Sequence, residues 1–584
     1  MLAPLQTQSM GRVISVRGSQ ARIGLMAGAM SDVTINATVG QFFGIRTAKS
    51  TLVAMITEVS RENLAAAGNY TAVAAVDLLG EIGGGPAGRF QRGITGYPSI
   101  GDPVDLLTNQ QLRTIYAPAR ADQIHIGTLQ QDSSVAACVD IEEMLSKHFA
   151  VLGSTGVGKS TGVSLLLNEI LNARPSLRVF LLDVHNEYGR CFGDKAVVFN
   201  PRNMKLPFWL FNFEEFVDVI FGGRPGIPEE LEVLVELIPM AKGLYTQYQN
   251  ADRAGLRRLD TKSVAYTADT PVPYRLVDLI SLIDQRMGKL ENRSSRIIYH
   301  RLIMRIETVK NDPRYAFMFE NANVGGDTMA DVISLLFRLP ANGRPMAVMQ
   351  LAGLPVEVVD SVVSVLCRMA FDFGLWSDGA SPMLFVCEEA HRYASADRTT
   401  GFGPTRKAVS RIAKEGRKYG VYLALVTQRP AELDSTIISQ CNTLFAMRLA
   451  NERDQELLRS AVSDAAANLL SFVPSLGTRE VLAFGEGVAL PTRLRFKELP
   501  AHQIPRSEST VATTPSTHNG HDIDFVTSVV DRWRGATAHR ETANDPVFDR
   551  LAERSIPQAP EAPMLQPSLG LDPDRFSVLK KPLR

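Results

Sequence analysis

The sequence predicts an α/β fold built on a parallel sheet, with a smaller domain of short β-strands in front of it. Three observations lead to this prediction. From Phe149 onward, short apolar runs alternate with segments of helical spacing, the pattern of a parallel sheet covered on both faces. Before them, residues 9–108 carry short alternating runs separated by glycines and polar clusters, which is typical of a small sheet or barrel. Residues 204–340 are mostly helical in pattern, which indicates a helical insertion.

Length and composition narrow the class of protein. The 584 residues are too many for one ordinary core, so two or three structural units are expected. The formal net charge is zero, which argues neither for nor against a nucleic-acid partner. Five widely separated cysteines without a CxxC pair favour a reducing compartment. No apolar run reaches the ~18 residues of a membrane span and no signal-peptide pattern is present, so we expect a cytoplasmic protein without a membrane segment.

The patterns divide the chain into five parts. The expected ranges are 1–110 for an N-terminal β-barrel, 111–147 for a linker, 148–203 and 341–502 for the sheet domain, 204–340 for the helical insertion and 503–584 for an extended tail. The tail is rich in Pro, Ser, Thr and charged residues and has one helical pattern, Ile523–Trp533.

Strands and helices are expected at the following positions. Strand candidates of the first domain are Gly11–Arg17, Val33–Ile35, Phe42–Ile45, Leu52–Val59 and Tyr70–Leu79. Those of the sheet domain are Phe149–Leu152, Val179–Asp183, Met346–Leu351, Met383–Cys387, Val421–Val426 and Thr443–Met447. Helical patterns of the insertion include Tyr274–Met287 and Arg296–Val309.

A glycine-rich loop follows the first strand of the sheet domain. Gly153-Ser-Thr-Gly-Val-Gly-Lys-Ser160 satisfies G-x4-G-K-[ST], between an apolar strand and an amphipathic helix. Such a loop turns backbone N–H groups toward phosphates at a helix N-terminus. Lys159 is expected to reach the β- and γ-phosphates, and the Ser160 hydroxyl to hold Mg²⁺. The residues expected to contact the nucleotide are Gly153, Ser154, Thr155, Gly156, Val157, Gly158, Lys159, Ser160 and Thr161. A chance glycine-rich turn is the alternative, and the strand–loop–helix context argues against it.

Carboxylates end two of the predicted strands. Met383–Cys387 is followed by Glu388, expected on the Mg²⁺ side, and Glu389, expected as the general base that orients water. Asp183 ends the strand after the phosphate loop, where it can assist the metal-bound water or be a plain loop acid. A solvated strand end carrying two acids is the alternative for the Glu pair.

Two further segments have functional and structural interpretations that remain open at this point. Gln428 follows the strand Val421–Val426, where its amide can sense the γ-phosphate. The segment Arg406–Tyr419 reads as a helix with a basic face, which can be only solvated, can contact nucleic-acid phosphates, or can supply an arginine to ATP bound by a neighbour. The residues of this face are Lys407, Arg411, Lys414 and Lys418, with Arg406 and Arg417 beside it.

Taken together, these segments resemble the HerA branch of the HerA/FtsK superfamily of hexameric DNA translocases. Asp183-Val-His-Asn-Glu-Tyr188 resembles the family's D-x-H-G-E-Y with Asn186 in place of Gly, and Glu388-Glu-Ala-His391 resembles D-E-A-H with Glu in place of Asp. Further matching stretches are His148–Gly153, Glu415–Gly420, Thr427–Pro430, Ser439–Asn442 and, at the end of the N-terminal barrel, Arg92–Val104.

The resemblance implies a RecA-like ATPase core assembled as a ring of six, with ATP and Mg²⁺ at subunit boundaries and double-stranded DNA in the channel. It implies that Gln428 is a sensor and that Arg417 is an arginine finger, acting in cis or in trans. The loop Ala394–Thr405 is expected as a pore element, with Arg398 and Arg406 touching DNA phosphates. Lys407 and Arg411 are also expected to contact DNA. The helix containing Trp533 is expected to brace a neighbouring subunit.

The expected function is ATP-driven DNA translocation or helicase activity together with an effector. The family implies a NurA-like nuclease, or a sirtuin-like or nuclease effector in phage defence, as partner. One alternative is a hexameric ATP-binding scaffold that assembles and regulates an effector with little motor activity. A secretion or conjugation ATPase is the second, and the N-terminal barrel and the lack of a membrane segment count against it.

Overall fold

The computed structural model describes residues 9–26, 37–61, 70–84, 88–116, 122–253, 266–289, 293–320, 322, 326–352, 354, 356–397, 403–462, 468–506, 527 and 530. The expected strand Val33–Ile35 lies outside these residues, as do Arg398 and almost all of the expected helix Ile523–Trp533. Within the described part of the chain, no helix has both the length and the apolar content needed to cross a bilayer.

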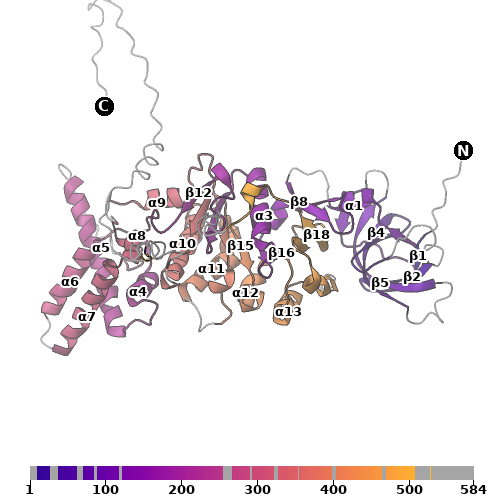
Figure 1. Ribbon diagram of the computed structural model, residues 1–584. Coiled ribbons are helices and arrows are strands. Elements are labelled where there is room, and N and C mark those ends of the chain that lie inside the picture. Colours follow the sequence, from indigo (N-terminus) through magenta and orange to yellow (C-terminus); the bar gives the residue numbers. More distant parts are fainter. Residues whose placement is uncertain are drawn as a thin grey trace, which may run out of the picture. The chain divides into compact units, whose positions relative to one another are not determined.

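The N-terminal strands close into a small barrel (Figure 1). They follow the order β2-β1-β7-β3-β4-β5, and β5 pairs back to β2, so that the ring of strands is complete. Val13 of β1 is buried in the core of the barrel, whereas Arg12 before it is exposed. The bounds are β1 Gly11–Arg17, β2 Gln20–Met26, β3 Phe42–Arg46, β4 Ser50–Ser60, β5 Tyr70–Gly83, β6 Phe90–Arg92 and β7 Pro103–Leu106. The predicted N-terminal barrel is confirmed.

The main sheet has a parallel half and an antiparallel half. Its order is β12-β13-β11-β14-β15-β10-β16-β17-β18-β8-β9, with parallel pairing from β12 to β16 and antiparallel pairing from β16 onward. The parallel strands are β10 His148–Leu152, β11 Arg178–Asp183, β12 Ala196–Phe199, β13 Met346–Gln350, β14 Met383–Cys387, β15 Val421–Thr427 and β16 Cys441–Ala446. The antiparallel strands are β8 Gln123–Leu129, β9 Ala136–Asp140, β17 Glu480–Gly485 and β18 Thr492–Phe496.

Helices cover the central strands, since every residue of β10, β13 and β14 is buried. Strand β15 lies between β10, which precedes the glycine loop, and β14, which ends in the two glutamates. The parallel strands therefore bring their carboxyl ends to one edge, as predicted for a RecA-like core, and that fold class is confirmed. The helices of the core are α3 Lys159–Ala173, α10 Val356–Trp376, α11 Gly403–Glu415, α12 Ser435–Ile438 and α13 Glu452–Ala461.

The stretch expected to be a linker, 111–147, departs from that expectation. It contains the end of α1 (Asn109–Tyr116), the hairpin β8–β9 and α2 (Ile141–Met144), and β8 pairs with β18 at the antiparallel end of the main sheet. Ile124, Ile126 and Leu129 are buried along β8. Their spacing is a weak strand signal, and the partner that stabilises it is more than 360 residues later in the chain, roughly the separation of Leu129 and Leu494.

The predicted helical insertion is confirmed as a set of helices, in which α5, α6 and α7 lie beside one another (Figure 1). The first helix of the insertion begins with a capping box, because the Asn212 side chain accepts from Glu215 N and the Glu215 carboxylate accepts from Asn212 N. The bounds are α4 Phe213–Phe221, α5 Pro228–Arg253, α6 Leu276–Gly288, α7 Arg293–Lys310, α8 Ala316–Phe319 and α9 Met329–Leu336.

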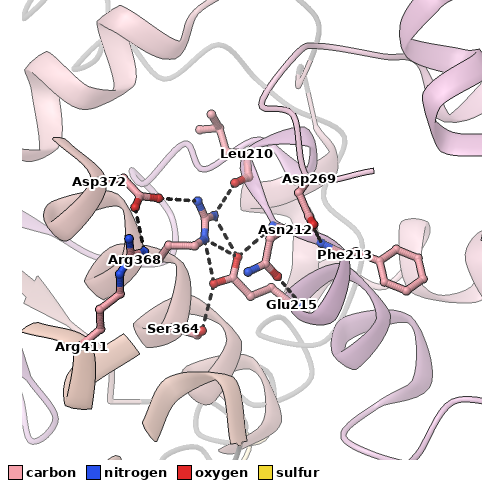
Figure 2. A network of polar contacts seen from close by, with 9 residues as sticks. All are labelled: Leu210, Asn212, Phe213, Glu215, Asp269, Ser364, Arg368, Asp372 and Arg411. Carbon is pink, nitrogen blue, oxygen red and sulfur yellow. Dashed lines mark hydrogen bonds and ion pairs between the residues drawn. The ribbon is translucent and has the colours of Figure 1, made fainter. Parts of the chain in front are cut away.

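Glu215 also ties the insertion to the core. Figure 2 shows the Arg368 guanidinium of α10 between Glu215 and Asp372, with Ser364 donating to the same Glu215 carboxylate. Arg368 Nη2 to Glu215 Oε2 measures 2.9 Å, and the carboxylate is 1% exposed. Arg411 of α11 then pairs with Asp372 at 3.2 Å. The network connects α4, α10 and α11, and a buried carboxylate needs this many partners to stay charged.

The basic helix is shorter than expected. Helix α11 ends at Glu415, and Gly416–Tyr419 form a 3₁₀ turn before β15. A Cβ added at Gly416 would lie 2.5 Å from the Val421 carbonyl oxygen, so the close approach of the two segments requires a glycine. Lys418 is therefore outside the regular helical face that its spacing predicted.

Candidate nucleotide site

The glycine loop has the backbone conformation of a phosphate-binding loop. Gly156 and Gly158 have φ of 77° and 94°, which glycine alone adopts without strain, and Gly158 is the N-cap of α3. The loop is attached to both neighbouring strands, because Gly153 N donates to Thr427 O at 3.2 Å and Ser154 N donates to Arg448 O at 3.0 Å. A Cβ at Gly156 would meet no atom within 4 Å, so space lies open above the helix N-terminus. Such a concavity suits an anion.

Lys159 lies at the base of this space and faces the acidic strand end. Its side chain is 8% exposed, and Nζ lies 3.4 Å from Glu389 Oε1. Burial lowers the pKa of Lys159, and the charges of Glu389 and Glu388 oppose that shift. The structure therefore brings together Lys159, which was predicted to bind phosphate, and Glu389, which was predicted to orient water.

Glu389 has an unusual backbone conformation and an unsatisfied oxygen. Its φ of 48° and ψ of 45° lie in the left-handed region, which costs a non-glycine residue free energy and is concentrated at functional sites. Oε2 is buried and makes no hydrogen bond, although His391 Nδ1 lies 3.3 Å away. His391 Nδ1 is instead 3.0 Å from Thr427 Oγ1, and burial lowers the pKa of His391 toward the neutral ring. Oε2 thus has an acceptor position free for water.

Glu388 and Asp183 lie behind this pair at the same edge of the sheet. Glu388 is 2% exposed, and its Oε2 accepts from Val184 N at 3.3 Å. Burial, with repulsion from Asp183 as the next cause, raises the pKa of Glu388 well above its usual value. Burial likewise raises the pKa of Asp183 to about 6. Both acids would ionise more readily beside a cation.

The Asp183 carboxylate has a structural role that the sequence did not predict. Its two carboxylate oxygens accept from Glu187 N and Tyr188 N, each at 3.0 Å. The carboxylate therefore organises the turn that follows β11, whereas the sequence suggested only assistance to a metal-bound water or a plain loop acid.

Gln428 reaches the glycine loop from the end of β15. Thr155 Oγ1 donates to Gln428 Oε1 at 2.5 Å, and the last four residues of β15, Ala424–Thr427, pair with Phe149–Leu152 of β10. The strand pairing thus brings the amide to the loop, within reach of the open space. The role of Gln428 as a γ-phosphate sensor stays a prediction.

The donors present fit Mg²⁺ with a nucleotide. No cluster of three or more His, Cys, Asp and Glu side chains arranged for a metal occurs in the described ranges. Mg²⁺ does not need such a cluster, because it is commonly held by one or two carboxylates, waters and the phosphates of the nucleotide. Ser160 in the first turn of α3 and the carboxylate of Glu388 can supply the protein ligands. The unpaired Glu389 Oε2 can hold a water of the same site.

Arg417 does not lie at this edge. It is exposed in the turn before β15, and its charge contributes to lowering the pKa of His148, which begins β10. The phosphate loop follows Leu152 at the other end of β10. At ~3.3 Å per residue the strand separates the two ends by roughly 13 Å. The structure therefore does not bring Arg417 to the loop of its own chain.

The residues expected to touch DNA have mixed surroundings. Lys407 pairs with Glu214 at 3.0 Å. Arg411 pairs with Asp372 and lies 4.0 Å over the Phe371 ring. Arg406 is half-buried, and Arg398 is outside the described residues. Lys407 and Arg411 are thus both paired with carboxylates of the same chain.

Two further residues were assigned no role from the sequence, Arg479 beside the loop and His148 at the opposite end of β10. Arg479 N donates to Val157 O at 3.0 Å, and Arg479 Cγ would lie 3.4 Å from a Cβ at Gly158. Arg479 has φ of 64° and its side chain pairs with Glu498 at 2.8 Å. The 1%-exposed His148 joins three elements, with Nε2 2.9 Å from Ala413 O and Nδ1 accepting from Leu423 N at 2.9 Å. Only three-dimensional pairing places both residues.

Comparison with known proteins agrees with the sequence resemblance. Residues 124–370 match the model of the family described as "Helicase HerA, central domain". The DNA double-strand break repair helicase HerA of Pyrococcus furiosus is 25% identical over 496 residues, which cover 80% of this chain and 82% of that protein. The HerA of Sulfolobus acidocaldarius is 25% identical over 409 residues, covering 68% and 73%. The solved structure of VirB4 of Thermoanaerobacter pseudethanolicus has a TM-score of 0.42 at 15% identity, covering 65% of this chain and 97% of that one.

The family match spans β8 to α10 and so includes the glycine loop. The match to the HerA central-domain model and the relatives at 25% identity confirm the resemblance to the HerA branch.

Proposed function

We propose that this chain hydrolyses ATP with Mg²⁺ and that hydrolysis drives movement of double-stranded DNA through a ring of six copies. The observation that carries the proposal is the Lys159–Glu389 pair at the open glycine loop, with one oxygen of Glu389 buried and without a hydrogen bond. A buried acceptor of this kind has lost its water contacts and has a free energy cost until a donor reaches it. Water aligned with a bound γ-phosphate is such a donor.

The residues divide the reaction between them. Lys159 and the loop amides bind the phosphates, while Ser160 and Glu388 would hold Mg²⁺, which would neutralise charge on the phosphate oxygens. Glu389 Oε2 orients a water and takes its proton as the water oxygen bonds to the γ-phosphorus and the bond to the β-phosphate oxygen breaks. Gln428 and Thr155 monitor whether the γ-phosphate is present. Glu389 is pre-positioned, because its strained backbone already aims the carboxylate at Lys159.

A neighbouring copy completes the site. Arg417 is exposed and lies near the opposite end of β10 from the loop, so we assign its guanidinium to ATP bound by the next subunit. This arrangement links hydrolysis to subunit contacts and supports a closed ring, the homo-hexamer implied by the family.

The DNA contacts are proposed for the loop Ala394–Thr405 and the start of α11. We favour Arg398 and Arg406 over Lys407 and Arg411, since the latter two already have acidic partners. Phosphate contacts carry no sequence information, so movement is expected to be independent of sequence and to weaken with salt. The relatives from Pyrococcus and Sulfolobus are named repair helicases, which supports DNA as the polymer.

An effector is proposed as partner, either a NurA-like nuclease in DNA end processing or a sirtuin-like or nuclease effector in phage defence. The competing proposal is a hexameric scaffold that binds ATP and regulates such an effector with little motor activity. The orphaned oxygen of Glu389 favours hydrolysis over binding alone, and the experiment below separates the two.

Substitutions at the Lys159–Glu389 pair test the proposal. Lys159→Ala is expected to abolish ATP binding, whereas Glu389→Gln is expected to keep binding and to lower turnover by ~10²–10⁴, the usual contribution of a general base. Lys289→Ala, at an exposed lysine of the insertion, is the matched control and should behave as wild type. Binding is measured by calorimetry and turnover by phosphate release. Wild-type turnover in either variant would remove the site assignment.

The same phosphate-release assay with duplex DNA separates motor from scaffold. A translocase should turn over faster with DNA, and the stimulation should fall as salt rises. A scaffold should show no stimulation, and its complex with the effector should survive Glu389→Ala. Stimulation that is absent at low salt would favour the scaffold.

A further inference from the structure

A basic patch at the amino edge of the parallel strands has no role in the function proposed above. It contains Arg178, which begins β11, and Arg338 and Arg344, which lie between α9 and β13. Its fourth residue is Trp376, which ends α10 and is 82% exposed. We infer that this patch binds single-stranded DNA, with the arginines on backbone phosphates and Trp376 stacked on an unpaired base. The site is separate from the loop Ala394–Thr405, for which contacts to duplex DNA are proposed.

Backbone carbonyl groups hold the arginines of the patch together. Arg178 Nε donates to Arg338 O at 2.9 Å, and Arg338 Nε donates to Arg344 O at 3.0 Å. The Nη1 atoms of Arg178 and Arg338 also donate to carbonyl oxygens, those of Ser176 at 2.7 Å and Leu335 at 3.4 Å. A guanidinium has five N–H donors, so these bonds orient both side chains and leave donors for an anion.

The positive charge of the patch is not matched by acidic side chains. Burial lowers the pKa of Arg338, and the charges of Arg344 and Arg178 lower it further. None of the ion pairs formed among the described residues includes any of the three arginines. Because like charges repel one another, the cluster has a free energy cost that a bound anion would remove.

A contact between aromatic rings brings Trp376 toward the arginines. The Phe337 ring, one residue before Arg338, lies 6.1 Å from the Phe373 ring of α10. Trp376 is three residues beyond Phe373, roughly one turn further along the same side of the helix. The indole therefore extends the side of α10 that packs against the segment of Arg338.

The loop after α10 makes a second connection. It leads from Trp376 to Pro382, whose carbonyl oxygen accepts from Arg178 N at 3.0 Å. Gly374, by contrast, faces the turn before β15, because a Cβ added there would lie 2.9 Å from Tyr419 O. Residues two apart on a helix are separated by about 200°, so Trp376 faces away from that turn, which contains the proposed arginine finger.

An exposed indole beside fixed guanidinium groups suits unpaired nucleotides. Bases of any sequence stack on aromatic side chains, while arginines bind the phosphates of the backbone. A duplex has the same phosphates, but its bases are already stacked on one another. An acidic peptide has carboxylates for the arginines but no base for the indole. The presence of both residue types therefore favours a single strand over either rival.

The fluorescence of Trp376 tests the site in the full-length chain carrying Trp533→Phe. An oligo(dT) of about 15 nucleotides, near the upper end of known site sizes, is expected to quench the emission without ATP. Trp376→Phe should remove this quenching, because the remaining tryptophan, Trp209, is 1% exposed. Duplex DNA of the same length should quench less. Absence of quenching by oligo(dT), or equal quenching by the duplex, would overturn the inference.

Fluorescence anisotropy of labelled oligo(dT) separates stacking from phosphate contacts. It is measured in the chain with Arg398→Ala and Arg406→Ala, which lacks the proposed contacts of the loop. Trp376→Ala should raise the Kd about tenfold, the usual effect of losing one stacked base, and keep its salt dependence. Arg344→Ala should lower the slope of log Kd against log salt by about 0.7, the share of one phosphate contact. Arg22→Ala, at an exposed arginine of the barrel, is the matched control and should change neither quantity.

Other occupants of the patch give different results. Equal quenching by polyglutamate would assign the patch to an acidic protein, and emission that follows protein concentration but not DNA would assign it to a neighbouring copy. Either result, or an unchanged salt slope in Arg344→Ala, would contradict the single-strand site. Quenching should persist in Lys159→Ala, since the patch lies at the opposite edge of the sheet from the glycine loop. Failure of the proposed function is therefore distinguishable from failure of this site.

Discussion

Two residues in the left-handed region stand at the edge of the sheet where the parallel strands β11 and β14 end. Glu389 has φ of 48°, and Asn186 has φ of 54° in the turn that resembles D-x-H-G-E-Y. The resemblance places glycine where this chain has Asn186. Asparagine is among the side chains that enter this region most readily, so the exchange keeps the turn. Its Oδ1 also accepts from Ala352 N at 3.2 Å, a contact that glycine cannot make.

This backbone conformation predicts how Asn186 tolerates change. Asn186→Val should lower the thermal unfolding midpoint, because a β-branched residue at positive φ costs more than the usual 1–2 kcal/mol for a left-handed residue. Asn186→Gly should stay close to wild type. Differential scanning fluorimetry at one scan rate compares the three proteins. Equal midpoints for Val and Gly would show that the turn is not held at positive φ.

Part of the nucleotide site could be predicted from single residues and their neighbours in the sequence. The glycine loop was predictable because each of its glycines satisfies a local requirement, visible in the φ of Gly156 and Gly158. Two features could not be predicted: the Glu389 oxygen that lacks a hydrogen bond, and the contact of Arg479 with the loop. Both depend on strands that meet only in the folded sheet.

At the scale of elements, His148 joins the strand before the loop to the strand of Gln428 and to the basic helix. Nδ1 accepts from Leu423 N, so the proton is on Nε2, which donates to Ala413 O. Burial lowers the pKa of His148 to about 4, with the charge of Arg417 as a further cause in the same direction. The neutral ring is thus the form that connects β10, β15 and α11.

The buried, neutral His148 predicts that the stability of the fold depends on pH. The folded-state pKa of about 4 lies below the ordinary 6.5, so the unfolded chain takes up the proton first as pH falls. Stability from His148 is complete above about pH 6.5 and is lost toward pH 4, by about 3.5 kcal/mol at most, since a tenfold change in proton affinity is worth about 1.4 kcal/mol.

His148→Gln keeps a donor for Ala413 O but does not titrate. Its unfolding midpoint should therefore fall less than that of the wild type between pH 6.5 and pH 4. Asp183, whose raised pKa acts with the opposite sign below about pH 6, is present in both proteins and cancels in the difference. Parallel pH profiles of the two midpoints would contradict the assignment.

The elements of the parallel half were largely predictable, because fully buried strands read as continuous apolar runs, as Met383–Cys387 does. The hairpin β8–β9 could not be predicted from the sequence. Its short runs gain their stability from pairing with β18, and strand order is invisible in a local pattern.

At the scale of the whole molecule, the length of β10 separates the glycine loop from Arg417, the proposed arginine finger. The loop follows one end, and Arg417 is near the other. A single copy can therefore bind a nucleotide, but it cannot place its own Arg417 on the γ-phosphate. In the proposed ring, each subunit boundary combines the glycine loop of one subunit with Arg417 of its neighbour.

Mixing variants tests this arrangement. Lys159→Ala and Arg417→Ala subunits should each be inactive alone. After exchange in an equal mixture, some boundaries contain an intact loop and an intact arginine, so phosphate release should reappear. A mixture that stays as inactive as its components would place Arg417 outside the neighbour's site. Native mass spectrometry, which shows whether mixed rings formed, is the control.

Two ion pairs of α11 affect salt-dependent measurements, and Figure 2 draws one of them, between Arg411 and Asp372. Lys407 with Glu214 and Arg411 with Asp372 fasten α11 to the insertion and to α10, and the first pair is well exposed to solvent. Exposed pairs of this kind weaken with ionic strength just as contacts to a nucleic-acid backbone do. A salt titration of DNA-stimulated turnover would therefore report two events together, release of the polymer and loosening of the helix that precedes β15. A titration without DNA would isolate the second.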